Sequence, residues 1–202
     1  MSARICCTLL ALALGCVPAL SQSIESAYTS FDAKTCKHEK GTDVEDYGSW
    51  RCPGYQGMRV LLSAGDQRMF VSYGPSRKND LATEQTFPGF NDVYEGTVEW
   101  RIEKPVKGKP RPFATILRWN VVTPEDSEKA TGPVKPTGRV LVVTRLGPGG
   151  LCHVGYVDAR ANPDANELAR KLADEHARTF MCGKDNRMVV GKTGSVAMPG
   201  GD

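Results

Sequence analysis

The distribution of seven cysteines constrains this 202-residue chain more than any other feature. Three of them lie in an apolar N-terminal segment. The other four lie in the more polar remainder of the chain, at Cys36, Cys52, Cys152 and Cys182. An even number of cysteines in an exported chain is typical of disulfides rather than of thiol chemistry. The interpretation of these four residues therefore depends on whether the chain is exported.

The first 21 residues have the pattern of a secretory signal peptide. Arg4 supplies a positive charge, residues 5–14 form an apolar run, and Ala19 and Ser21 place small residues before a cleavage site. The run is too short to span a bilayer as a mature helix, and no later segment is long and apolar enough to be transmembrane. We therefore predict a signal peptide at 1–21 and a periplasmic or secreted protein.

Lipoprotein anchoring through Cys16 is the alternative to cleavage after Ser21. A lipobox has a large aliphatic residue followed by a small one before the modified cysteine. The residues before Cys16 are Ala13, Leu14 and Gly15, which fit that pattern less well. Cleavage after Ser21 is thus the favoured prediction.

Four cysteines allow three pairings, of which local geometry favours one. Cys36 and Cys52 flank a turn-rich segment, and a hairpin there would place them opposite each other. Cys152 begins a predicted strand and Cys182 follows a predicted helix, whose length would return it beside Cys152. We expect disulfides 36–52 and 152–182, each stabilising the fold by roughly 3–4 kcal/mol through loop closure.

Short runs of β-branched and aromatic residues, separated by Gly and Pro turns, predict strands. Hairpins are expected at 58–74, with Gly65 taking the positive φ of the turn, and at 139–158. In residues 97–103 the alternation places Val98, Trp100 and Ile102 on a core face and the charged residues on the other. Residues 22–35 are poorly patterned and predict an exposed arm.

A single segment, residues 163–181, has the 3–4 spacing of an amphipathic helix, with Asn162 as its N-cap. The predicted fold is α+β, an antiparallel β-sheet of about six to eight strands with one C-terminal amphipathic helix packed on it and two disulfides. The domain is expected to span 22–183. Residues 184–202 are expected to be a tail that forms a short strand or is disordered.

Charge and motif composition exclude several classes of function. The chain carries a net charge of +3, and loss of Arg4 leaves +2, with the charges interspersed, so nucleic acid is not expected as a partner. The "GKT" at 191–193 lacks the earlier glycine of a phosphate loop. The three histidines, His38, His153 and His176, lack the companions of a zinc site. We therefore predict no catalytic residue, no metal ligand and no cofactor.

Two sets of residues are candidates for contact with a partner. The first is a Pro-stiffened basic loop that would meet an envelope protein or an anionic envelope surface, and it comprises Lys104, Lys107, Lys109 and Arg111. The second is Trp50 with Tyr55, which would form a ligand-stacking face if both side chains face solvent.

Residues 28–74 carry an ordered set of motifs: Tyr-Thr at 28–29, Cys36, Trp-Arg-Cys-Pro-Gly at 50–54, Gly-Asp at 65–66 and Phe-Val-Ser-Tyr-Gly at 70–74. This order resembles a group of uncharacterised small exported proteins of proteobacteria. The resemblance implies an envelope location and paired cysteines, and it implies no activity and no catalytic residue.

These observations support three hypotheses of different classes. The first is a non-enzymatic binding or accessory protein of the cell envelope. The alternative is a periplasmic inhibitor of a hydrolase such as lysozyme, since a stiff loop plugs an active site at little ordering cost. The second alternative is an unrecognised enzyme, which requires a pocket with converging titratable side chains.

Overall fold

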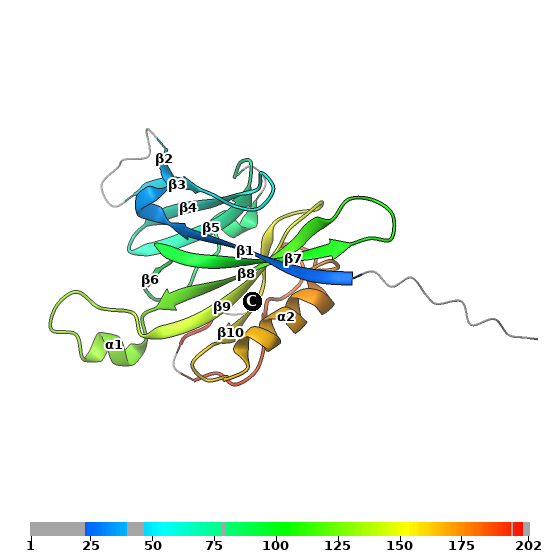
Figure 1. Ribbon diagram of the computed structural model, residues 1–202. Coiled ribbons are helices and arrows are strands. Elements are labelled where there is room, and N and C mark those ends of the chain that lie inside the picture. The colour runs from blue at the N-terminus through cyan, green and yellow to red at the C-terminus, as the bar shows by residue number, and fades with distance from the viewer. Residues whose placement is uncertain (1–22, 40–46, 78–79, 195, 200–202) are drawn as a thin grey trace, which may run out of the picture.

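The computed structural model describes residues 23–39, 47–77, 80–194 and 196–199, which form a small sheet, a long sheet and a helix lying one on another (Figure 1). The predicted signal peptide, including Cys16, lies outside the described residues. No helix in the described part of the chain is long and apolar enough to cross a membrane.

The long sheet has seven strands. Six of them lie side by side in the order β1 (Ser23–Asp32), β7 (Glu95–Lys104), β8 (Arg111–Val121), β9 (Gly138–Arg145), β10 (Cys152–Asp158) and β11 (Met188–Val189), and β6 (Asn91–Asp92) also pairs with β8. All pairings are antiparallel except that of β10 with β11, which is parallel. The sheet is therefore mixed rather than purely antiparallel.

A second, four-stranded sheet packs on one face of the long sheet. Its strands lie in the order β2 (Lys37–His38), β3 (Gly48–Cys52), β4 (Arg59–Gly65) and β5 (Arg68–Gly74). The prediction of one sheet was therefore wrong. Alternating apolar residues identify a strand and its buried face, but they do not say which of two sheets the strand joins.

The prediction of an exposed arm at residues 22–35 was also wrong. β1 pairs with β7 along all ten of its residues, from Ser23 opposite Lys104 to Asp32 opposite Glu95. The strand lies at the edge of the sheet, and nine of its ten residues are exposed or only partly buried. An edge strand of this kind has no clear alternation, because neither of its faces is fully covered.

Two cores separate the three layers. Between the sheets, the fully buried rings of Trp100 and Trp119 pack with Val60 and Leu62 of the small sheet. The prediction that Val98, Trp100 and Ile102 face the core is confirmed. On the opposite face of the long sheet, α2 (Ala165–His176) packs through its buried residues Ala165, Ala169, Leu172 and Ala173.

The start of α2 differs from the prediction. Its N-cap is Asp164, whose side chain makes no capping hydrogen bond. Asn162 instead binds the C-terminal segment, accepting from the Lys192 N–H at 2.9 Å and donating to the Lys192 carbonyl at 2.8 Å. The remaining helical elements are one turn or little more: η1 (Ala33–Thr35), η2 (Leu81–Thr83) and α1 (Pro124–Glu128).

Both predicted disulfides are confirmed. Cys36 and Cys52 are joined at a Cα–Cα distance of 4.6 Å, and Cys152 and Cys182 at 5.8 Å. The first bridge ties the chain after β1 to β3 of the small sheet. The second ties the segment after α2 to β10 of the long sheet, so each bridge reinforces a different layer.

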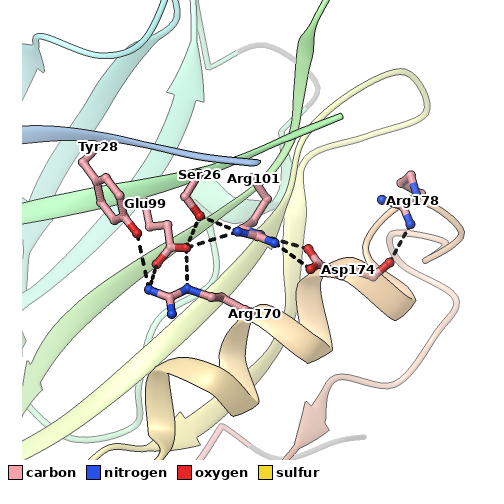
Figure 2. Close-up of polar contacts among 7 residues, drawn as sticks. All are labelled: Ser26, Tyr28, Glu99, Arg101, Arg170, Asp174 and Arg178. Carbon is pink, nitrogen blue, oxygen red and sulfur yellow. Dashed lines mark hydrogen bonds and ion pairs between the residues drawn. The ribbon is translucent and has the colours of Figure 1, made fainter. Parts of the chain in front are cut away.

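A cluster of paired charges joins β7 to α2 (Figure 2). Arg170 binds Glu99 through two hydrogen bonds of 2.7 and 3.1 Å, and Arg101 binds Asp174 through two of 2.9 and 2.6 Å. Ser26 on β1 donates to Glu99 at 2.5 Å. Glu99 and Arg101 were predicted to lie on a polar face, and they do, but α2 covers that face and both residues are buried.

The charge state of Glu99 follows from these contacts. Burial opposes its ionisation, but the hydrogen bonds from Arg170 and Ser26 and the nearby guanidinium charges outweigh burial and hold the pKa of Glu99 below its ordinary value. A buried pair of charges is stable only while both partners are present and hydrogen-bonded. The ionised form of Glu99 therefore contributes to the stability of the contact between helix and sheet.

Replacing Glu99 by Gln should lower the free energy of unfolding by about 2–3 kcal/mol at pH 7, because the guanidinium of Arg170 loses its anionic acceptor. A carboxyl group with a lowered folded-state pKa stabilises the fold above its unfolded pKa and loses that effect as the pH falls through the folded value. The difference in the free energy of unfolding between wild type and variant should thus reach its full size above about pH 5. It should shrink below the ordinary pKa of 4.5.

Urea unfolding at a series of pH values measures this gap. The matched control is Glu25→Gln on the neighbouring strand, since Glu25 pairs with Lys104 at the exposed edge and such pairs contribute about 0–1 kcal/mol. Equal losses for the two variants, or a gap that does not change with pH, would contradict the assigned role of Glu99.

Candidate functional site

A groove of about 770 Å³ opens where one end of the small sheet meets the long loop that follows β8. We call it the aromatic groove. Its aromatic residues come from two separate segments of the chain, Tyr47 and Trp50 from the start of β3, and Phe90 and Tyr94 from either side of β6. The third contributing segment is the loop after α1, which supplies Pro133, Val134 and Pro136.

Most of the exposed aromatic surface of the described residues lies in this groove. Four of the aromatic residues of that part of the chain (Phe, Tyr and Trp) are exposed, and three of them, Tyr47 at 60%, Tyr94 at 50% and Phe90 at 41%, line the groove. Clustered exposed aromatic residues mark binding surfaces more often than single ones do. The groove is therefore the best candidate site of the molecule.

Two glycines make room for the rings of Tyr47 and Trp50. A Cβ atom on Gly65 would lie 2.5 Å from Cε1 of Tyr47, and a Cβ on Gly48 would lie 2.5 Å from Cη2 of Trp50. Each ring thus covers the bare backbone of a strand glycine, a packing that compensates for the missing side chain. The ring of His38 lies 5.4 Å from that of Trp50 and supports it from the neighbouring strand.

Gly65 therefore has a role other than the predicted one. The β4–β5 hairpin is present, but its two positive φ angles belong to Asp66 and Gln67, at 52° and 56°. Positive φ at both central residues is the geometry of a two-residue type I′ turn, which favours Asn, Asp and Gly. Gly65 lies in β4, paired with Arg68, and the space above it is occupied by the Tyr47 ring.

The polar groups at the base of the groove are already engaged. Buried Asn91 accepts from the Met69 N–H at 3.1 Å and donates to Thr86 and to the Gly89 carbonyl, both at 3.0 Å. Asp92 accepts from Asn120 at 2.6 Å, and Arg68 pairs with Asp66. The groove thus offers aromatic rings beside polar groups, of which Asn91, Asp92 and Arg68 are engaged within the protein.

One wall of the groove is held in place by α1. The side chain of Asp126 accepts from the Thr137 N–H and hydroxyl at 2.9 and 2.8 Å, and it forms a capping box with Thr123. Burial opposes ionisation of Asp126, but its hydrogen bonds with Thr123 and Thr137 outweigh burial and lower its pKa to about 2. The two ends of the Pro-rich loop are thus tied together at neutral pH.

Of the predicted candidates Trp50 and Tyr55, both half-buried and packed against the core between the sheets, only Trp50 lines the groove. Trp50 is half-buried and lines the groove, whereas Tyr55 packs its ring 6.1 Å from the buried ring of Trp100. β3 separates the two residues, since Tyr55 follows the strand and the groove lies at its start. Trp50 remains a candidate contact residue, and Tyr55 belongs to the edge of the core.

The predicted basic residues lie at the other end of the long sheet, in the β7–β8 hairpin. Two of the four are paired: Lys104 binds Glu25 at 2.6 Å, and Arg111 binds Glu103. Lys107 and Lys109 are exposed at the tip. The groove and this hairpin are separated by the whole length of β8, whose eleven residues extend about 35 Å.

Two buried titratable residues with shifted pKa values, His153 and Asp80, lie outside the groove. Burial lowers the pKa of His153 to about 3, and its Nδ1 lies 3.1 Å from the Tyr156 hydroxyl inside the core. Burial raises the pKa of Asp80 to about 6, but its carboxylate binds Ser72 and the Ala82 N–H. Within residues 23–39, 47–77, 80–194 and 196–199, no group of three or more His, Cys, Asp and Glu could hold a metal ion.

The sequence carried only a weak signal for the groove. Its aromatic residues are spread over 48 positions, and three of them lie outside regular strands. No protein-family model, curated protein or solved structure matches this chain.

Replacing Gly48 by Ala should displace the Trp50 ring and shift its fluorescence emission to longer wavelength, because the added methyl group would overlap the ring. Trp100 and Trp119 are almost fully buried, so a change in emission reports on Trp50. The control is Gly132→Ala, where an added Cβ meets no atom within 4 Å. Unchanged emission in Gly48→Ala would show that the ring does not lie over this glycine.

Proposed function

We propose that this chain is an exported, non-enzymatic binding protein of the cell envelope and that the aromatic groove is its ligand site. The observation that carries the proposal is the convergence of three exposed residues, Tyr47, Phe90 and Tyr94, with Trp50 in one groove. Two disulfides support an oxidising compartment, as does the N-terminal segment of the sequence.

The chemistry of the groove favours an extended, proline-containing peptide segment of another envelope protein. Proline-rich segments bind grooves lined by aromatic rings, because a polyproline II helix is rigid before binding and presents flat apolar rings. The groove already has two proline residues of this chain, Pro133 and Pro136, in its wall. A sugar chain would need several free hydrogen-bonding groups, and Asn91 and Asp92 at the base are engaged within the protein.

The same geometry favours binding over bond cleavage. A hydrolytic site needs an acid or base within hydrogen-bond reach of the reacting atoms. The carboxylate of the groove, Asp92, is bound to Asn120, and the carboxyl group with a near-neutral pKa, Asp80, does not line the groove. His38 also lines the groove, with its ring against Trp50. Among the described residues, the carboxylate of the groove is thus engaged within the protein, which supports binding rather than hydrolysis.

A proline oligomer should change the tryptophan emission of the protein in a saturable way, because Trp50 is the tryptophan that lines the groove. Phe90→Ala and Tyr94→Ala should each weaken binding by about 1–2 kcal/mol, since truncating an aromatic contact residue removes a large part of the interface energy. Fluorescence titration measures both effects, and Trp50→Phe should abolish the signal.

The matched control is Tyr28→Ala. Tyr28 is exposed to a similar degree, 58%, but lies on β1 outside the groove. A Gly-Ser oligomer of the same length controls for unspecific peptide binding. Equal weakening by Tyr28→Ala, equal binding of the Gly-Ser oligomer, or an absence of any emission change would each exclude a proline-peptide site at this groove.

A further inference from the structure

The chain enters the fold directly beside the basic hairpin. Ser23, the first residue of β1, is paired with Lys104, the last residue of β7. In Figure 1, β1 begins on the same side of the molecule as the β7–β8 hairpin. Eight residues lie between Leu14, the end of the apolar run, and Ser23, and the nine residue steps reach at most about 30 Å. A leader held in a membrane during export would therefore keep this hairpin close to the bilayer.

The tip of the hairpin combines positive charge with an exposed apolar side chain. Val106 is 55% exposed and is followed by the exposed Lys107 and Lys109. Within the described residues, neither lysine has a carboxylate within ion-pair distance, whereas Lys104 and Arg111 at the base of the hairpin are paired. The charge of the hairpin is thus concentrated at its tip.

The hairpin also holds its tip in a defined direction. Pro105 and Pro110 restrict the backbone on both sides of the tip, and Gly108 makes the turn with a φ of 115°. The neighbouring β9–β10 turn, residues 146–151, contains no charged side chain. This turn therefore does not offset the two positive charges beside it.

From these observations we infer that the hairpin tip, residues 106–109, is a membrane-facing surface that binds the anionic headgroups of a lipid bilayer. Lysine ammonium groups bind lipid phosphates, and a neighbouring aliphatic side chain enters the interfacial region. The inference does not depend on the ligand of the aromatic groove. Two lysines give weak attachment by themselves, and the leader, before it is cleaved, strengthens it by raising the effective concentration of the hairpin at the membrane.

Vesicle flotation of the exported chain, beginning at Gln22, tests this inference. The protein should float with vesicles of phosphatidylcholine and phosphatidylglycerol, and much less with vesicles of phosphatidylcholine alone. Higher salt should weaken binding, because the contact is electrostatic. Lys107→Ala/Lys109→Ala should lower the partition constant about thirtyfold, which corresponds to about 1 kcal/mol for each lysine.

The matched control is Lys34→Ala/Lys135→Ala, which removes two exposed lysines at the other end of the long sheet, one after β1 and one after β8. Both double variants should melt at the wild-type temperature, since all four side chains are exposed. Three results would overturn the inference: no preference of the wild type for anionic vesicles, wild-type binding by Lys107→Ala/Lys109→Ala, or an equal loss in the control variant. The last result would mean that general positive charge, rather than this tip, attracts the protein.

Discussion

All three layers of this protein depend on the two faces of β7. One face carries Trp100, which packs against Tyr73 of the small sheet and Tyr55 beside it. The other face carries Glu99 and Arg101, which bind α2 through two-point hydrogen bonds. Apolar packing thus holds one neighbouring layer and paired charges hold the other, so β7 is buried on both sides although its sequence alternates.

The two contacts differ in how strictly they specify geometry. Apolar packing tolerates small shifts, provided that volume is conserved. Buried guanidinium and carboxylate groups must be fully paired, because a displaced partner leaves an unpaired charge away from water. Arg170 and Asp174 are four residues apart on α2, and Glu99 and Arg101 are two apart on β7. Both ion pairs form only where the four-residue spacing on α2 lies opposite the two-residue spacing on β7. This requirement fixes the position of α2 along the sheet.

The sequence was sufficient to predict local features. Both disulfides, the hairpins at 58–74 and 139–158 and the core position of Trp100 follow from turn residues, spacing and alternation. Features that depend on contacts between distant segments were not predicted. β1 was not predicted because this edge strand lacks clear alternation. The burial of Glu99 was not predicted because the residue that covers it, Arg170 of α2, lies 71 positions further along the chain.

The aromatic groove was beyond prediction for the same reason. Trp50 was identified as a candidate, but Tyr47, Phe90 and Tyr94 become neighbours only through the packing of the small sheet beside β6. Gly65 is the clearest example of a residue whose role the sequence does not reveal. Its position in a turn-like sequence suggested that it adopts a positive φ. In the structure, its lack of a side chain instead leaves space for the ring of Tyr47. A sequence pattern does not distinguish these two uses of glycine.

The placement of one disulfide in each of two layers has a consequence for when the chain folds. In a reducing cytoplasm neither bridge forms, so the small sheet and the contact of α2 with β10 both lack their covalent support. Together the bridges contribute roughly 6–8 kcal/mol on the loop-closure model, which is comparable to the whole stability of a typical domain, about 5–15 kcal/mol. Reduction of both bridges should therefore remove a large part of the stability of the fold, and oxidation should restore it. The two bridges thus make the stability of two layers depend on the redox state of the surroundings.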